Sequence, residues 1–208
     1  MGPYLIYGAF AGALLSSILY FLSSGGTAKY VKQARMLFHV SAILTISSTA
    51  FLLYLIMTHQ FQYTYVWNYS SRDLPWNLLI ATFYAGQEGS FHLWAFLMAI
   101  LGVFLLPYLA NRDSEILPGN LPNDKYEPLV MGTFTLLSAF LLFIMIIKSP
   151  YMFVWQSFPA DVQLGFIPED GRGLNPLLQN FWMSIHPPIL FTGFTSLSIP
   201  FSFAIAAL

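Results

Sequence analysis

Four histidines are the side chains of this sequence best suited to hold a metal or a haem iron: His39, His59, His92 and His186. A neutral imidazole can ligate haem iron, and ionisable side chains inside membranes are commonly functional. His39 and His59 lie at the two ends of one apolar segment, where polar residues are ordinary at a membrane interface. The neighbours of His92 and His186 are more specific.

His92 lies four residues after Glu88, so the two side chains share one face of a helix. Gln87 and Glu88 stand among small residues in the stretch AGQEGS, at the predicted start of that helix. An acid at a helix N-terminus is also favoured by the helix dipole. Two interpretations stay open: a buried Glu–His contact that satisfies both side chains, or a proton relay or ligand site.

His186 is followed directly by Pro187 and Pro188. Proline is favoured at the first position of a helix, and the residue before a proline is biased toward an extended conformation. The pattern therefore predicts a helix that begins at Pro187, with His186 extended at a rigid corner between loop and helix. Such a corner suits a ligand, but it also suits a purely structural role.

Arg172 lies in the turn-rich stretch GRGLNPLLQ. A guanidinium pairs in two-point fashion with carboxylates, including haem propionates, although a solvated surface arginine is the alternative. Motifs of common soluble enzymes are absent, namely the phosphate-binding loop, GxSxG and HExxH. The chain has no cysteine, which excludes disulfides, thiolate metal sites and a cysteine nucleophile within it.

The composition is that of a membrane protein. Of 208 residues, 57% are hydrophobic and 8% are charged, against about 25% charged residues in an average soluble domain. The net charge of −1 provides no basic field for nucleic acid. A soluble enzyme is therefore not expected.

We predict an all-α fold, a polytopic helical membrane bundle in which residues 1–208 form a single membrane domain. The N-terminal MGPYLIYGAF lacks a positive n-region, so it is interpreted as a retained span rather than a signal peptide. The last span reaches Leu208 without a flanking charge, so the chain either stops abruptly or is the front part of a longer or split protein. The five predicted transmembrane segments cover about 3–23, 36–58, 89–109, 129–147 and 187–208.

Lysine and arginine in the loops predict that the N-terminus is outside. The loops at about 59–88 and 149–186 are then also outside, and both are rich in tryptophan and tyrosine. These aromatics form either an interfacial belt or a platform for a flat apolar ligand. The predicted inner loops carry Lys29, Lys32, Arg35, Arg112 and Lys125, and the outer loops carry Arg72, Lys148 and Arg172.

Three stretches together carry a family resemblance: YVWNYSSRDLP, GQEGSFHLW and GRGLNPLLQNFWMSIHPPILFTGF. In order and spacing they resemble the N-terminal part of the CcmF family of c-type cytochrome maturation proteins, which belongs to the wider haem-handling family with a tryptophan-rich segment. The resemblance implies that His186 is one of two outer histidines that ligate haem. It also matches Glu88 to an acidic residue of the family, whereas His92 has no ligand assignment to carry over.

The sequence departs from the family in several places. The second outer histidine, the tryptophan-rich segment and the histidines for a b-type haem lie beyond the fifth helix in the family. Many members have histidine where this chain has Gln87, and an Asp-Phe pair where it has Gln60 and Phe61. We therefore expect one haem ligand here, His186, with Trp182 and the outer aromatics lining the haem and Arg172 facing a propionate.

The function implied by the resemblance is part of a cytochrome c haem lyase in a bacterial inner membrane. Its implied cofactor is haem, and its implied partners are apocytochrome c and haem-delivery and thiol-reducing maturation proteins. The resemblance fits equally well a paralogue that attaches haem in nitrite-reductase assembly. Two alternatives come from other functional classes. A transporter or proton-conducting subunit would use Glu88 and His92, although the mid-membrane positions of the chain are nearly all apolar. A purely structural membrane subunit is the other alternative.

Overall fold

The computed structural model describes residues 1–24, 29–114 and 126–208, and these form a bundle of long helices. The bundle helices are α1 (Gly2–Ser23), α2 (Val31–Met57), α5 (Gln87–Ser114), α6 (Glu127–Ile147) and α8 (Phe181–Ala206). All five are long and apolar enough to cross a membrane. The predicted all-α membrane bundle with five spans is confirmed.

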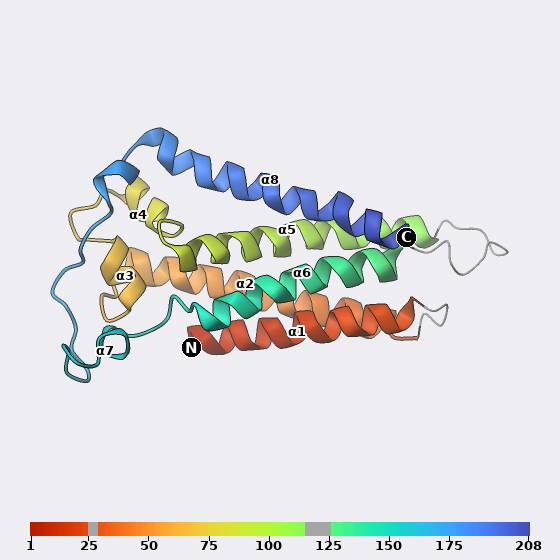
Figure 1. Cartoon of the computed structure of the whole chain (residues 1–208), viewed down its shortest axis with the longest axis horizontal. Helices are drawn as coiled ribbons and strands as arrows, with labels where there is room; N and C mark the ends of the chain where they lie inside the picture. Colours follow the sequence, from red (N-terminus) through yellow and green to blue (C-terminus); the bar gives the residue numbers. More distant parts are fainter. Residues whose placement is uncertain (25–28, 115–125) are drawn as a thin grey trace.

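The short elements gather at one end of the bundle, beside the N-terminus, and we call this the loop end (Figure 1). The C-terminus lies at the opposite end. The orientation predicted from charges would place the loop end outside the membrane. The short elements are α3 (Thr64–Tyr69), α4 (Trp76–Thr82), α7 (Val154–Ser157) and the 3₁₀ turn η2 (Pro176–Leu178).

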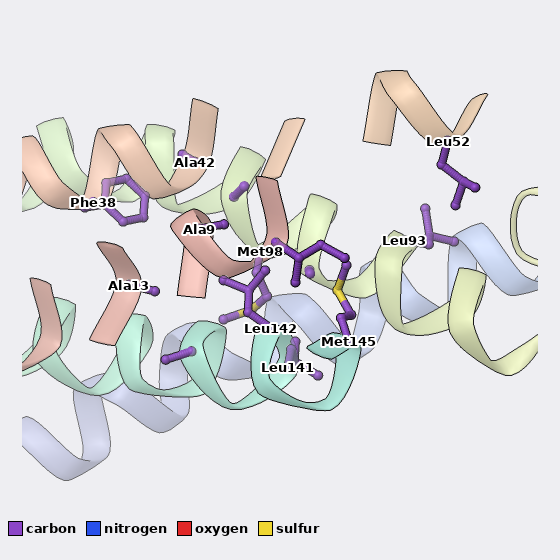
Figure 2. Close-up of a cluster of buried hydrophobic side chains, with 14 of the residues drawn as sticks. Ala9, Ala13, Phe38, Ala42, Leu52, Leu93, Met98, Leu141, Leu142 and Met145 are labelled. Atoms are coloured by element: carbon purple, nitrogen blue, oxygen red, sulfur yellow. The ribbon is translucent and has the colours of Figure 1, made fainter. Parts of the chain in front are cut away.

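The core is formed where α1, α2, α5 and α6 meet (Figure 2). Lipid tails are as apolar as leucine, so close packing and interhelical hydrogen bonds must hold such helices together. Ser41 donates a hydrogen bond to the carbonyl of Ala9 at 2.7 Å, and Ser17 donates one to the carbonyl of Gly132 at 2.8 Å. Buried side chains drawn in Figure 2 include Ala9, Ala13, Phe38, Ala42, Met98, Leu141, Leu142 and Met145.

The interior is more polar than predicted, because serine and threonine hydroxyls occupy buried positions on α1, α2 and α6. Most of them donate to a backbone carbonyl, often the one four residues earlier in the same helix. Thr45, for example, bonds the carbonyl of Ser41 at 2.9 Å. Hydroxyls satisfied in this way can be buried in a bilayer without forming a polar path.

At the end opposite the loop end, α2 and α5 extend further than the apolar stretches predicted. α2 begins at Val31 rather than near residue 36, and α5 continues to Ser114 rather than ending near residue 109. Backbone hydrogen bonds do not depend on hydropathy, so a helix can continue through charged residues beyond the hydrocarbon. Both extensions carry charged side chains, Arg35 and Asp113, that are anchored at the end opposite the loop end.

α8 lies at the edge of the bundle, where it packs against α5 and α6 (Figure 1). Little of its membrane-spanning surface is buried within the chain. Exposed apolar side chains along it include Phe181, Trp182, Ile189, Leu197 and Phe201. This edge helix also carries His186.

Candidate functional site: a histidine at the edge of an apolar cleft

His186 lies inside α8, which corrects the prediction of an extended residue before a helix that starts at Pro187. The helix begins at Phe181, and the Asn180 side chain caps it by accepting a hydrogen bond from the Trp182 amide at 2.9 Å. Capping by asparagine at this point starts the helix more than one turn earlier than the prolines suggested. His186 is therefore helical, and its side chain is exposed.

Pro187 and Pro188 stand within the helix, a position where proline normally costs a hydrogen bond. Pro188 has no N–H to donate to the carbonyl of Ser184, four residues earlier. The hydroxyl of Tyr84 donates to that carbonyl instead, at 2.5 Å. A residue 100 positions away in the chain thus supplies the donor that the local sequence lacks.

An apolar cleft of about 270 Å³ opens on one side of His186. It lies between α8 and the junction of α4 with α5, and its polar groups come from Tyr84, Ser90 and His186. Apolar walls with a few convergent polar groups are typical of ligand sites. Leu174, Leu178 and Phe191 supply part of the apolar lining.

A second, open surface lies on the other side of His186, along the exposed face of α8. Trp182, Ile185 and Ile189 flank the imidazole there. Trp182 precedes His186 by one helical turn, and 73% of its surface is exposed. The structure therefore brings together two of the predicted site residues, His186 and Trp182, on one solvent-accessible face.

Arg172 lies on a separate part of the loop end, fixed against α3. Its backbone N–H donates to the carbonyl of Trp67 at 2.7 Å, and its guanidinium lies 4.1 Å from the centre of the Trp67 ring. The neighbouring Gly171 packs so tightly on the Ser70 carbonyl that a Cβ atom would collide with it. Arg172 is exposed, but it does not line either surface beside His186.

Gln87 and Glu88 occupy the first turn of α5, as predicted. Gln87 is exposed, and Glu88 is partly buried close to Tyr65 and Tyr69. Burial is the main cause that raises the pKa of both tyrosines, and the Glu88 charge raises it further. These tyrosines therefore remain neutral hydrogen-bond donors at physiological pH.

His92 is fully buried, and neither ring nitrogen has a hydrogen-bond partner among the described residues. Of the two interpretations of this pair, the buried Glu88–His92 contact that satisfies both side chains is therefore wrong. Aromatic rings enclose the imidazole instead: Phe83 lies 5.7 Å away between ring centres, and Tyr151 lies 6.2 Å away. Burial of Glu88 with His92 would have required two polar groups to leave water, whereas Glu88 stays at the partly exposed helix start.

The other histidines do not join the site. His39 is exposed in the first half of α2, toward the end opposite the loop end. His59 follows α2 in a left-handed backbone conformation with φ of 52°. Its Nδ1 atom is buried without a partner in the described part of the chain. Within residues 1–24, 29–114 and 126–208, no group of three or more His, Cys, Asp or Glu side chains could hold a metal ion.

Sequence reasoning missed Tyr84 and Ser90, which line the cleft with His186. Tyr84 stands just before the stretch AGQEGS, and Ser90 ends it, but the candidates predicted within it are Gln87 and Glu88. The role of both residues depends on contacts between α8 and the start of α5. A weak signal existed: a proline pair within a helix requires outside donors for the carbonyls that it leaves free, and tyrosine hydroxyls are suitable donors.

Comparison with known proteins identifies the family. The sequence model described as "Cytochrome C assembly protein" matches residues 84–208, which include the start of α5, the whole of α8 and the residues that line the cleft except Ala81. The chain belongs to the cytochrome c assembly protein family.

Relatives and a solved structure agree with this assignment. The chain is 35% identical over 159 residues to the cytochrome c-type biogenesis protein CcmF of Pseudomonas fluorescens, covering 76% of this chain and 21% of that protein. It is 30% identical to CcmF of Haemophilus influenzae, covering 88% of this chain and 26% of the relative. It is also 29% identical to the probable cytochrome c-type biogenesis protein NrfE of Escherichia coli, covering 76% of this chain and 25% of that one.

A solved structure of the cytochrome c haem lyase CcmF has the same fold, with a TM-score of 0.68 and 24% identity. It is matched by 100% of this chain over 30% of its own length. The chain thus spans about a quarter of the length of the curated relatives that it matches.

Proposed function

We propose that this chain is part of a cytochrome c haem lyase that holds haem at the loop end of the bundle for attachment to apocytochrome c. The observation that carries the proposal is the placement of His186. Its imidazole is exposed on α8, between an apolar cleft and an apolar helix face, within the segment that matches the family.

The residues present fit a haem ligated from one side. An exposed imidazole can approach iron, and the apolar side chains beside it can pack against a porphyrin ring. Of the four histidines, only His186 lines either surface. His92 is enclosed by aromatic rings, His39 lies in the other half of the bundle, and His59 follows α2 outside both surfaces. The proposal therefore requires a second axial ligand from outside this chain.

When bound, haem supplies the vinyl groups to which the thiols of an apocytochrome Cys-x-x-Cys-His segment add. The contribution of this chain is position rather than reactive groups. His186 would hold the iron, and Trp182 with Ile189 would support one edge of the ring. The chain has no cysteine, so its own thiols cannot compete for the vinyl groups.

Arg172 is proposed as a propionate partner with a specific geometry. The Trp67 ring beneath its guanidinium limits the positions that the charged group can take, and cation–π contact leaves its N–H edges available for a carboxylate. Because Arg172 lies off the two surfaces beside His186, the proposal requires the bound haem to extend beyond them.

The proposed setting is a bacterial inner membrane, with the loop end on the periplasmic side. The proposed partners are apocytochrome c and the maturation proteins that deliver haem and reduce the apocytochrome thiols. The match to NrfE supports a second version of the same function, in which the apocytochrome belongs to nitrite-reductase assembly. Proton conduction through Glu88 and His92 lacks support, because the His92 nitrogens have no polar partner in the described structure.

Haem titration of the detergent-purified chain tests the proposal. Ferric haem should bind wild type and His39→Ala with equal affinity, because His39 is exposed in the other half of the bundle. His186→Ala should weaken binding by at least about tenfold, which corresponds to about 1.4 kcal/mol. Equal binding by all three proteins, or binding by none, would contradict the proposal.

A further inference from the structure

The turn of α8 that carries His186 lacks a helical hydrogen bond. Pro188 has no backbone N–H, so the carbonyl of Ser184 has no donor from within the helix at that position. His186 lies between these two residues. Left without another donor, this turn would be a weak point of the helix, at the place where the imidazole must be held still.

Tyr84 corrects this defect from another part of the chain. Its hydroxyl donates to the Ser184 carbonyl at 2.5 Å. The carbonyl of Tyr84 in turn accepts a hydrogen bond from the Ser90 hydroxyl at 3.1 Å, which ties it to the first turn of α5. Both Tyr84 and Ser90 line the cleft beside His186.

Tyr84 is suited to act as a constant donor. It is half-buried, and burial raises the pKa of its hydroxyl above the ordinary value of 10.0. The hydroxyl therefore keeps its proton throughout the physiological range of pH. The contact is short, and it joins the edge helix α8 to the α4–α5 junction, where α8 is otherwise little buried.

We propose that Tyr84 is a positioning residue for His186: its hydroxyl replaces the donor that Pro188 lacks and fixes the turn that presents the imidazole. The value of this positioning for haem rests on the function proposed above. The mechanical part of the inference, that Tyr84 restrains the turn, does not require haem and is tested without it.

The test without haem uses a spin label. The chain has no cysteine, so Ile189→Cys gives a single labelling site, three residues after His186 on an exposed position. Tyr84→Phe removes only the hydroxyl, and the nitroxide at position 189 should become more mobile by electron paramagnetic resonance. Tyr108→Phe is the matched control, since Tyr108 lies on α5 with 60% of its surface exposed; it should leave the mobility unchanged.

A double-mutant cycle separates this role from general stabilisation. Pro188→Ala returns an N–H to the helix, so the Ser184 carbonyl regains its own donor. In that background Tyr84→Phe should have little effect on the label. Unchanged mobility in Tyr84→Phe, or an equal increase with and without Pro188→Ala, would overturn the inference.

Haem affinity provides the second readout. Loss of one neutral hydrogen bond should weaken haem binding by about threefold to tenfold in Tyr84→Phe, and Pro188→Ala should restore most of it. If no variant binds haem while the mobility pattern holds, the proposed function fails and the positioning of the turn stands. If haem binding depends on His186 but the label does not respond to Tyr84→Phe, the positioning fails and the proposed function stands.

Discussion

The guanidinium of Arg35 and the carboxylate of Glu127 form a two-point ion pair that joins α2 to α6, with N–O distances of 2.7 and 2.5 Å. The Glu127 side chain is 3% exposed and that of Arg35 is 39% exposed. The Asp113 carboxylate accepts the Glu127 amide at 2.9 Å, so α5 is tied to the same point. This cluster fixes three helices at the end opposite the haem site that we propose.

Loss of Arg35 should destabilise the bundle because it leaves the buried Glu127 carboxylate without its charged partner. Removal of one member of a fully buried pair costs about 3–5 kcal/mol, and solvent near the half-exposed arginine reduces the expected cost of Arg35→Met to about 2 kcal/mol. Unfolding in detergent measures it, with the exposed Lys32→Met on the same helix as control. Equal stability of the two variants would contradict a structural role for the pair.

His92 should be replaceable by an apolar residue. Both of its ring nitrogens are buried without partners in the described structure, and such burial costs about 1–3 kcal/mol. His92→Leu should therefore unfold no more easily than wild type, and haem binding should not change. A variant that folds but loses haem would instead show that His92 serves the site, as a ligand or relay.

Gly89 should not tolerate a side chain. It lies in the first turn of α5, where a Cβ atom would collide with the Phe83 carbonyl and the Tyr65 hydroxyl. Gly89→Ala should destabilise the protein by about 1–3 kcal/mol through overpacking. Gly193→Ala is the matched control, because the space around Gly193 is open and alanine favours a helix over glycine. Comparable unfolding of the two variants would refute the close packing at Gly89.

The contact between Asp170 and Arg72 at the loop end should be lost only in strong acid. Asp170 accepts the backbone amides of Arg72 and Gly171, at 3.0 and 2.7 Å. These bonds, with the nearby charges of Arg72 and His59, hold the Asp170 pKa below its ordinary value of 3.8. A depressed pKa means that the contact is fully present above pH 3.8 and is lost as pH falls through the lower, folded-state value.

Hydrogen exchange at the Arg72 and Gly171 amides measures this contact. Exchange in Asp170→Asn should be faster than in wild type at neutral pH, whereas Glu169→Gln should match wild type. Protection that is already lost well above pH 4 in wild type would show that the carboxylate does not hold these amides.

The sequence was sufficient for the parts of the fold that depend on composition. Long apolar stretches predicted five spans, and a chain with few charges cannot cover a soluble surface. The structure of the loop end could not be predicted in this way, because α3, α4 and α7 are too short to leave a periodic pattern in the sequence. Arg35 shows a related limit. Because it is charged, it was predicted to lie in a loop, whereas its ion pair with Glu127 allows α2 to continue through it.

The sequence singled out candidate residues for the site, but it did not predict their geometry. His186 was singled out by its proline neighbours and by family resemblance, yet the same prolines gave a wrong helix start. The rule that proline favours the first position of a helix takes no account of the Asn180 cap or of the hydrogen bond from Tyr84. Likewise, four-residue spacing placed Glu88 and His92 on one face, but it did not show that aromatic rings would enclose His92 alone.

Ligand exchange at position 186 tests most directly whether His186 ligates the haem iron. His186→Cys would place the only thiol of the chain where the imidazole stands, and ferric haem bound to the variant should show the absorption spectrum of thiolate rather than imidazole ligation. That result would place residue 186 on the iron. A spectrum identical to that of wild type would mean that the iron is held elsewhere, and the account of His186 as the haem ligand would be wrong.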